Sequence, residues 1–178
     1  MNKAFTLVET LVVIVIIVIL SLIILPNYNS MRQQLAFQRS AFKLAQDIRT
    51  VQEMAMSAKE FEGEIPEGGY GMYLRKVPSP QISYVLYVDK NNNHKYDSGA
   101  GSGETIEEIS LENGIKILSL SGNHSNIIFT PPDPTVFFTD ADGIDLGLDQ
   151  VSIVFSLISD ETKTKTISVN KAGLVNIE

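Results

Sequence analysis

MNKAFTLVETLVVIVIIVILSLIILP, residues 1–26, decides the organisation of this 178-residue chain. From residue 11 to residue 25 every side chain is apolar except that of Ser21. Residues 5–25 would form a helix about 32 Å long, close to the hydrocarbon thickness of a bilayer. Beyond Pro26 the composition becomes that of a water-facing protein. We therefore expect one membrane-embedded element followed by one water-facing domain.

Glu9 lies near the start of this segment, where a carboxylate is costly. Well inside a spanning helix the cost is about 2.5–3.5 kcal/mol, and it is smaller near an end. A cationic partner would explain the residue, and a cut after Ala4 would create one on the amino group of Phe5. A secretory signal peptide explains less, because only Lys3 is basic and no small-residue cleavage site follows the run. A plain membrane anchor would leave Glu9 without a partner.

The residues Lys3-Ala4-Phe5-Thr6-Leu7-Val8-Glu9 resemble the cleavage and methylation motif of type IV pilins and type II secretion pseudopilins. The resemblance implies that prepilin peptidase removes the leader, residues 1–4, and that the new N-terminal Phe5 is N-methylated. Glu9 matches the family's acidic residue, and Pro26 matches its proline after the apolar run. Ala4 departs from the pattern, because glycine usually precedes the cut.

The same resemblance implies an assembly role for the N-terminal helix. Glu9 would pair with the amino group of Phe5 on a neighbouring subunit and set the axial register in a low-dielectric filament core. The implied partners are other pilin or pseudopilin subunits, prepilin peptidase and an inner-membrane assembly platform. The chain would first be a single-pass protein of the cytoplasmic membrane, with its globular domain outside the cytoplasm. It would then enter a periplasmic or extracellular filament.

Residues 26–62 are predicted to form an amphipathic helix that continues residues 5–25. Pro26 is expected to kink the helix or end it locally, with a break at Asn27-Tyr28-Asn29. Apolar side chains then recur at helical spacing: Ala41, Leu44, Ile48, Val51, Ala55 and Ala58. This stripe indicates a helix lying on the sheet of its own domain, and a partner-binding helix is the alternative. One helix from about Phe5 to about Glu60, bent at Pro26, is the simplest interpretation.

Residues 63–178 are predicted to form a β-rich globular domain. Strand-like runs occupy residues 70–76, 82–88, 105–111, 115–120, 126–130, 136–139, 151–158, 163–169 and 174–177. Both faces of 82–88 are apolar, which predicts a central strand. The expected fold class is α+β, with a long N-terminal helix packed on a C-terminal antiparallel sheet. We expect the strands to follow one another as a meander.

The segment 89–97 is the first candidate calcium loop. Asp89, Asn91, Asn93 and Asp97 fall at alternate positions, as oxygen ligands do in such loops. The glycine of the sharp turn is absent, and the final bidentate acid is missing unless Glu104 supplies it. The alternative is a polar loop between two strands. The segment also loosely resembles the Asp-x-Asn-x-Asn segment of H-class minor pseudopilins and related minor pilins.

The segment 140–149 is the second candidate. Asp140, Asp142, Asp145 and Asp149 surround a flexible glycine, and a hard cation would relieve their mutual repulsion. This loop also lacks a complete ligand set, so a solvated loop is again the alternative. Apart from calcium we expect no cofactor.

Composition restricts the remaining function classes. The chain has no cysteine, which excludes a disulfide, a thiol nucleophile and a cysteine metal site. Its net charge of −7 argues against nucleic acid as a partner. No catalytic motif is present, so we do not expect an enzyme. We predict a structural pilin-like subunit, a minor pseudopilin or pilin rather than a major one; a major type IV pilin and a membrane-anchored binding domain that never polymerises are the alternatives.

Overall fold

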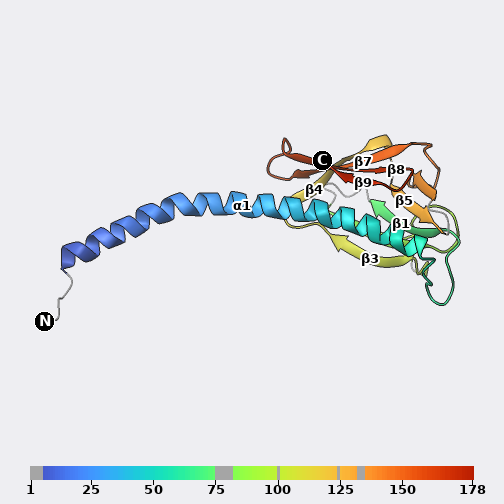
Figure 1. Ribbon diagram of the computed structural model, residues 1–178, viewed down its shortest axis with the longest axis horizontal. Coiled ribbons are helices and arrows are strands. Elements are labelled where there is room, and N and C mark those ends of the chain that lie inside the picture. Colours follow the sequence, from blue (N-terminus) through green and yellow to red (C-terminus); the bar gives the residue numbers. More distant parts are fainter. Residues whose placement is uncertain (1–5, 75–81, 100, 124, 132–134) are drawn as a thin grey trace. The chain divides into compact units, whose positions relative to one another are not determined.

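The computed structural model describes residues 6–74, 82–99, 101–123, 125–131 and 135–178 (Figure 1). The chain divides into two compact units, residues 1–36 and residues 37–178. One helix, α1 (Leu7–Met56), begins in the first unit and ends in the second. Ala4 and Phe5 lie outside the described residues.

The helix assignment of α1 is continuous across position 26. The break expected at residues 27–29 is therefore wrong, although the prediction of one long helix is right. A proline removes one backbone donor, and the hydrogen bonds on either side can carry a helix past it.

The helix ends at Met56, four residues before the expected end near Glu60. Ala58 has a φ of 45°, in the left-handed region. The N–H of Lys59 donates to the carbonyl of Met54 (3.0 Å), and that of Ala58 donates to the carbonyl of Ala55 (3.0 Å). These two bonds form a Schellman cap, which satisfies the last carbonyls of the helix. The apolar spacing placed Ala58 in the stripe, but its backbone conformation places it beyond the helix.

Replacing Ala58 by glycine is expected to raise the free energy of unfolding by about 0.5–1 kcal/mol. A left-handed conformation costs alanine about 1–2 kcal/mol, and the greater freedom of glycine in the unfolded chain removes part of that gain. Urea unfolding of a fragment from about residue 30 onward measures the change. As a control, Ala45→Gly in the buried interior of α1 is expected to lose about 1 kcal/mol or more. Equal destabilisation by both substitutions would contradict the assignment of this cap.

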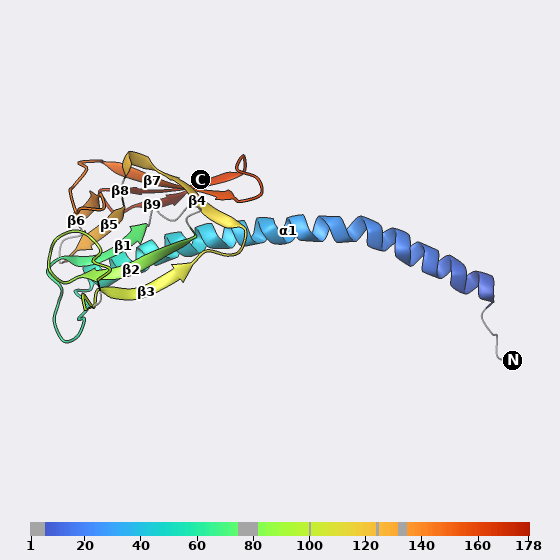
Figure 2. The same ribbon diagram turned by 180° about the vertical axis from the view of Figure 1, so that it is seen from behind.

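Two antiparallel sheets follow α1 (Figures 1 and 2). The first has the order β3-β2-β1-β5-β6 and the second the order β4-β7-β8-β9. The strand bounds are β1 Gly69–Leu74, β2 Ser83–Asp89, β3 Thr105–Ser110, β4 Ile115–Leu120, β5 Asn126–Thr130, β6 Thr135–Thr139, β7 Gln150–Leu157, β8 Thr164–Asn170 and β9 Val175–Ile177. The strand positions and the interior place of β2 agree with the sequence prediction. The simple meander is wrong, because the chain leaves the first sheet to form β4 and returns to it for β5 and β6.

The C-terminal part of α1 supplies one wall of the core. The predicted stripe from Ala41 to Ala55 is at most 1% exposed. Polar contacts fix the helix against a strand of each sheet: the Tyr84 hydroxyl donates to Asp47 Oδ2 (2.5 Å), and Arg49 Nη2 donates to the carbonyl of Val175 (3.2 Å). The stripe therefore packs within its own domain, which agrees with the first of the two sequence interpretations.

Candidate functional site

The N-terminal turn of α1 is the first candidate site. Thr6 Oγ1 accepts a hydrogen bond from the N–H of Glu9 (3.2 Å), as the first residue of a capping box does. Glu9 stands in the first turn, where the helix dipole favours a negative charge. Glu9 thus has a local role in starting the helix, which the sequence spacing Thr-x-x-Glu could have indicated. Its pairing with Phe5 of a neighbour stays a prediction.

The segment Leu7–Ile24 is long and apolar enough to cross a membrane, and none of it is buried within the protein. Apart from Glu9, its polar side chains are the hydroxyls of Thr10 and Ser21, and both bond carbonyls of the same helix. Ser21 Oγ donates to the carbonyl of Ile17 (2.8 Å), and Thr10 Oγ1 donates to that of Thr6 (3.1 Å). The segment therefore presents an apolar surface that lipid or other apolar helices can cover.

The loop that follows β2 is the second candidate site, and it folds around a buried carboxylate. Asp89 is fully buried, and its two oxygens accept the N–H groups of Asn93 (3.1 Å) and His94 (2.8 Å). Asp97 Oδ2 accepts hydrogen bonds from the side-chain amides of Asn91 and Asn93, both at 2.8 Å. The four predicted ligand residues do come together, but they are bonded mainly to one another and to the loop's own backbone.

Glu104, the acid that the sequence offered to complete the ligand set, also contacts this loop. It is 1% exposed and accepts the N–H of Asp97 (2.8 Å). Burial raises the pKa of Glu104, and the nearby carboxylates of Asp97 and Asp89 add to that effect. Hydrogen bonds, first from Asn91, lower the pKa of Asp97. Burial, followed by the charge of Asp89, raises the pKa of Tyr87 beneath the loop.

The same loop covers the face of the first sheet that carries Val85, Tyr87 and Ile128. The Tyr96 ring centroid lies 5.4 Å from that of Tyr87, and His94 stacks on Phe137 at 4.5 Å. This explains why both faces of β2 are apolar: one face serves the main core and the other lies under the loop.

Asn126, at the start of β5, joins the two candidate calcium loops. Its Oδ1 accepts the N–H of Tyr96 (3.2 Å) and the hydroxyl of Tyr87 (3.3 Å). Its Nδ2 donates to Thr139 Oγ1 (3.1 Å) and to the carbonyl of Asp140 (2.7 Å). Asn126 is fully buried with all four bonding positions used. The sequence analysis did not identify Asn126 as a site residue. The one indication in the sequence is that an amide residue begins an otherwise apolar strand.

The second loop lies against the first. A Cβ on Gly143 would come within 2.4 Å of the carbonyl oxygen of Asn93, so only glycine fits between the loops. Asp140 Oδ1 accepts the N–H groups of Asp142 (2.9 Å) and Ile144 (3.0 Å). Asp145 Oδ1 accepts the N–H of Gly147 (3.0 Å), so these carboxylates also bond their own backbone.

The residues suited to a cation are Asp89, Asp97 and Glu104 in the first loop, with Asp140 and Asp145 in the second. In the part of the chain that the structure describes, no three His, Asp or Glu side chains are grouped as a metal site requires. Calcium binding stays a prediction.

Calcium is expected to raise the melting temperature of a fragment from about residue 30 onward, and chelation to lower it. A ligand at about 100 times its Kd adds about 2.7 kcal/mol to the free energy of unfolding. The measurement is thermal unfolding with added calcium and again with excess chelator. Identical melting temperatures would mean that the two loops do not bind calcium and are only polar loops packed on the sheet.

The N-terminus and the fold of this chain are each similar to those of pilins. Residues 1–25 match the family model described as the prokaryotic N-terminal methylation motif. The fold is similar to that of a solved structure described as the type IV minor pilin FimU of Pseudomonas aeruginosa strain PAO1. The predicted resemblance and fold class are thereby confirmed.

Two crystal forms of FimU match this chain, both at 11% sequence identity. The form in space group P21 has a TM-score of 0.56, covering 83% of this chain and 92% of FimU. The form in space group P65 has a TM-score of 0.52, covering 79% of this chain and 91% of FimU. A search of curated proteins finds none that matches the sequence.

Proposed function

We propose that this chain is a structural subunit of a type IV pilus or a type II secretion pseudopilus. The proposal rests on the presence, in the same chain, of an N-terminal methylation motif and a fold similar to that of a pilin. In the proposed pathway prepilin peptidase cuts after Ala4, Phe5 is N-methylated, and an inner-membrane platform assembles the chain with other pilin subunits. The exposed apolar surface of residues 7–24 supports this pathway, because it suits a membrane first and a bundle of helices afterwards.

Within this class we propose a minor subunit. Both matched structures are of a type IV minor pilin, and the Asp89–Asp97 loop has the spacing that resembles H-class minor pseudopilins. A pilin subunit acts by assembling with other subunits, so the proposed role involves no catalysis. Before assembly the globular domain would lie outside the cytoplasm, attached to the inner membrane by residues 5–25.

Mass spectrometry of the chain from filament fractions tests the proposal. The expected mature chain lacks residues 1–4 and carries one methyl group on Phe5. An Ala4→Gly variant, which restores the usual residue before the cut, should be processed at least as completely. A chain that keeps its leader and stays only in the membrane would instead support a membrane-anchored binding domain.

A further inference from the structure

The turn at residues 112–115 carries the chain from the first sheet to the second. It follows β3 and ends with the first residue of β4, and these two strands belong to different sheets. The N–H of Ile115 donates to the carbonyl of Glu112 (3.2 Å), which closes the turn. Gly114 has a φ of 87°, the conformation that a type II turn requires at its third residue. The turn therefore holds the pair Asn113-Gly114 at the surface, where both residues are exposed.

Both sides of this turn are held, but the peptide group in its middle is free. Glu112 Oε1 and Oε2 accept hydrogen bonds from Arg39 Nε (3.1 Å) and Nη2 (2.9 Å). The carbonyl of Gly114 accepts the N–H of Ile158 (2.8 Å). The carbonyl and side chain of Asn113 and the N–H of Gly114 form no hydrogen bond with any described residue. The peptide group between Asn113 and Gly114 can therefore rotate without losing a hydrogen bond of its own.

An exposed asparagine followed by glycine has the atoms for a reaction within the chain. The backbone nitrogen of Gly114 attacks Cγ of Asn113, a five-membered succinimide ring closes, and Nδ2 leaves as ammonia with the proton of the attacking N–H. Water then opens the ring at either carbonyl and gives aspartate or isoaspartate at position 113. A Cβ on Gly114 would meet no other atom within 4 Å, so the attacking nitrogen and water both have room.

From these observations we infer that Asn113 is a site of spontaneous deamidation in the folded chain. The reaction needs only water, so the converted fraction grows with the age of each molecule. It is independent of filament assembly, because both reacting groups lie in one turn of one chain.

The turn at Asp142-Gly143 could form the same ring, but its nitrogen is held. The N–H of Gly143 donates to the carbonyl of Asp140 (3.3 Å). Gly143 also packs closely against the backbone of Asn93, where even a Cβ would come within 2.4 Å of the carbonyl oxygen. The sequence alone makes Asn113 and Asp142 equal candidates, and the contacts of the two glycines separate them.

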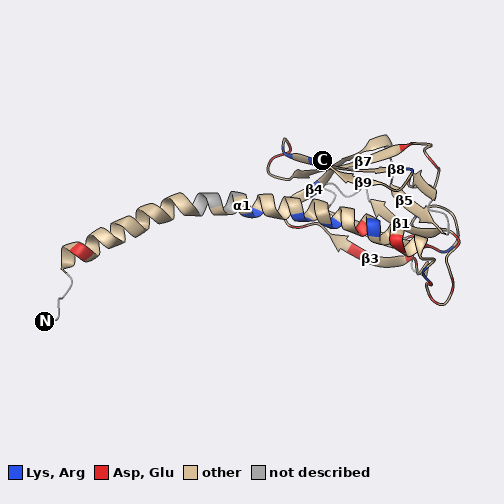
Figure 3. Ribbon diagram, viewed as in Figure 1, with Lys and Arg blue, Asp and Glu red and all other residues tan. Residues whose placement is uncertain are grey.

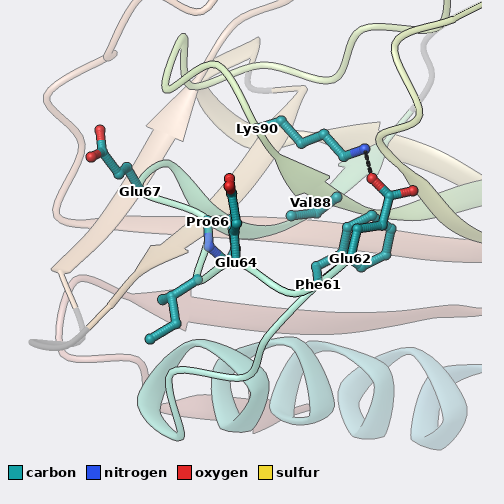
Figure 4. Close-up of a pocket in the computed structure, with 8 residues that line it drawn as sticks. Phe61, Glu62, Glu64, Pro66, Glu67, Val88 and Lys90 are labelled. Atoms are coloured by element: carbon teal, nitrogen blue, oxygen red, sulfur yellow. Dashed lines mark hydrogen bonds and ion pairs between the residues drawn. The ribbon is translucent and has the colours of Figure 1, made fainter.

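The turn at Glu62-Gly63 differs in its side chain. Gly63 has a φ of 92° and open space around it, much as Gly114 has. The longer side chain of Glu62 would have to close a six-membered ring, and its carboxylate is already held by Lys90 (2.6 Å; Figure 4). Among these three turns, only that at Asn113 combines a free nitrogen with a side chain of the right length.

Conversion adds one negative charge to the −7 of the chain, beside an acid that already pairs with α1. Between Glu9 and Asp47 the charged residues of α1 are all basic (Figure 3), namely Arg32, Arg39 and Lys43. The new carboxylate stands next to Glu112 in the sequence and so competes with it for Arg39. The isoaspartyl product also lengthens the main chain by one methylene at the crossing between the sheets.

Peptide mapping of the full-length chain in detergent tests the site. The chain is incubated in mildly alkaline buffer, in which the attacking nitrogen loses its proton more readily, and is then digested with trypsin. Residues 96–116 form one peptide, in which Asn113 is the only asparagine. Mass spectrometry follows the change from amide to acid and distinguishes aspartate from isoaspartate by fragmentation.

Asn176 is the matched control within the same digest. It is exposed, and it is the only asparagine of residues 172–178. It lies on β9, and the branched side chain of Ile177 obstructs attack by the next nitrogen. We expect Asn113 to convert about tenfold faster than Asn176, which corresponds to a barrier lower by about 1.4 kcal/mol.

Three results would overturn the inference. The first is an Asn113 that stays intact in the folded chain and converts only in urea, and the second is an equal rate at Asn113 and Asn176. The third is isoaspartate at Asp142 as abundant as at position 113, because the free N–H of Gly114 would then not matter. Asn113→Gln should leave the fold unchanged at this exposed position and remove the converted form of residues 96–116.

Discussion

Glu9→Ala is expected to leave membrane insertion intact and to lower incorporation into filaments by a hundredfold or more. Removing one member of a buried ion pair costs about 3–5 kcal/mol, since the other charge stays buried without a partner. Each 1.4 kcal/mol is about a factor of ten in an equilibrium. The measurement compares the amount of subunit in sheared filaments with the amount in the membrane fraction.

Because Thr6 caps the first turn of α1 and Glu9 lies in that turn, a control must separate the charge of Glu9 from any effect on the start of the helix. Glu9→Gln keeps a side chain that suits the third helical position but removes the charge. If Glu9 acts by pairing with an amine, Glu9→Gln should fail to assemble nearly as badly as Glu9→Ala. Normal assembly of Glu9→Gln would assign Glu9 to capping alone and reject the pairing with Phe5.

Asn126→Ala is expected to lower the free energy of unfolding by about 3–5 kcal/mol. The substitution leaves the N–H of Tyr96, the hydroxyl of Tyr87 and the carbonyl of Asp140 without their buried partner. Each unsatisfied buried group costs about 1–3 kcal/mol, and relaxation recovers part of the sum. Urea unfolding of a fragment from about residue 30 onward measures the loss.

Asn176→Ala on β9 is the matched control, because Asn176 is exposed. Its effect should stay within about 0.5 kcal/mol. Asn126→Ala should also increase protease cleavage in residues 89–97 and 140–149 together, since the amide joins both loops. A loss of similar size in both variants, or cleavage in only one loop, would contradict the role given to Asn126.

Local periodicity predicted the elements of this fold well. The stripe from Ala41 to Ala55 is buried as expected, and the double-sided apolar pattern of residues 82–88 placed β2 inside a sheet. The pattern could not show the division into two sheets, because strand order depends on contacts between residues far apart in the chain. It also could not locate the end of α1, where Ala58 adopts a conformation that usually calls for glycine.

The candidate sites were predictable to different degrees. Glu9 and the motif around it stand out because an acid in an apolar run is costly. The composition of residues 89–97 drew attention to a loop but suggested only cation binding. This loop covers the sheet because the rings of Tyr96 and His94 contact rings on other strands. The loop is linked to residues 140–149 through Asn126. Such contacts exist only once the sheet has formed.

The way α1 is attached to both sheets has a mechanical consequence. The bonds from Asp47 to Tyr84 and from Arg49 to Val175 join a single turn of the helix to two different sheets. A pull along the helix axis would therefore strain both attachments and the buried stripe at the same time, in shear. Contacts strained together share the force, whereas contacts opened in sequence fail one by one. The globular domain is thus built to stay attached to a helix under tension.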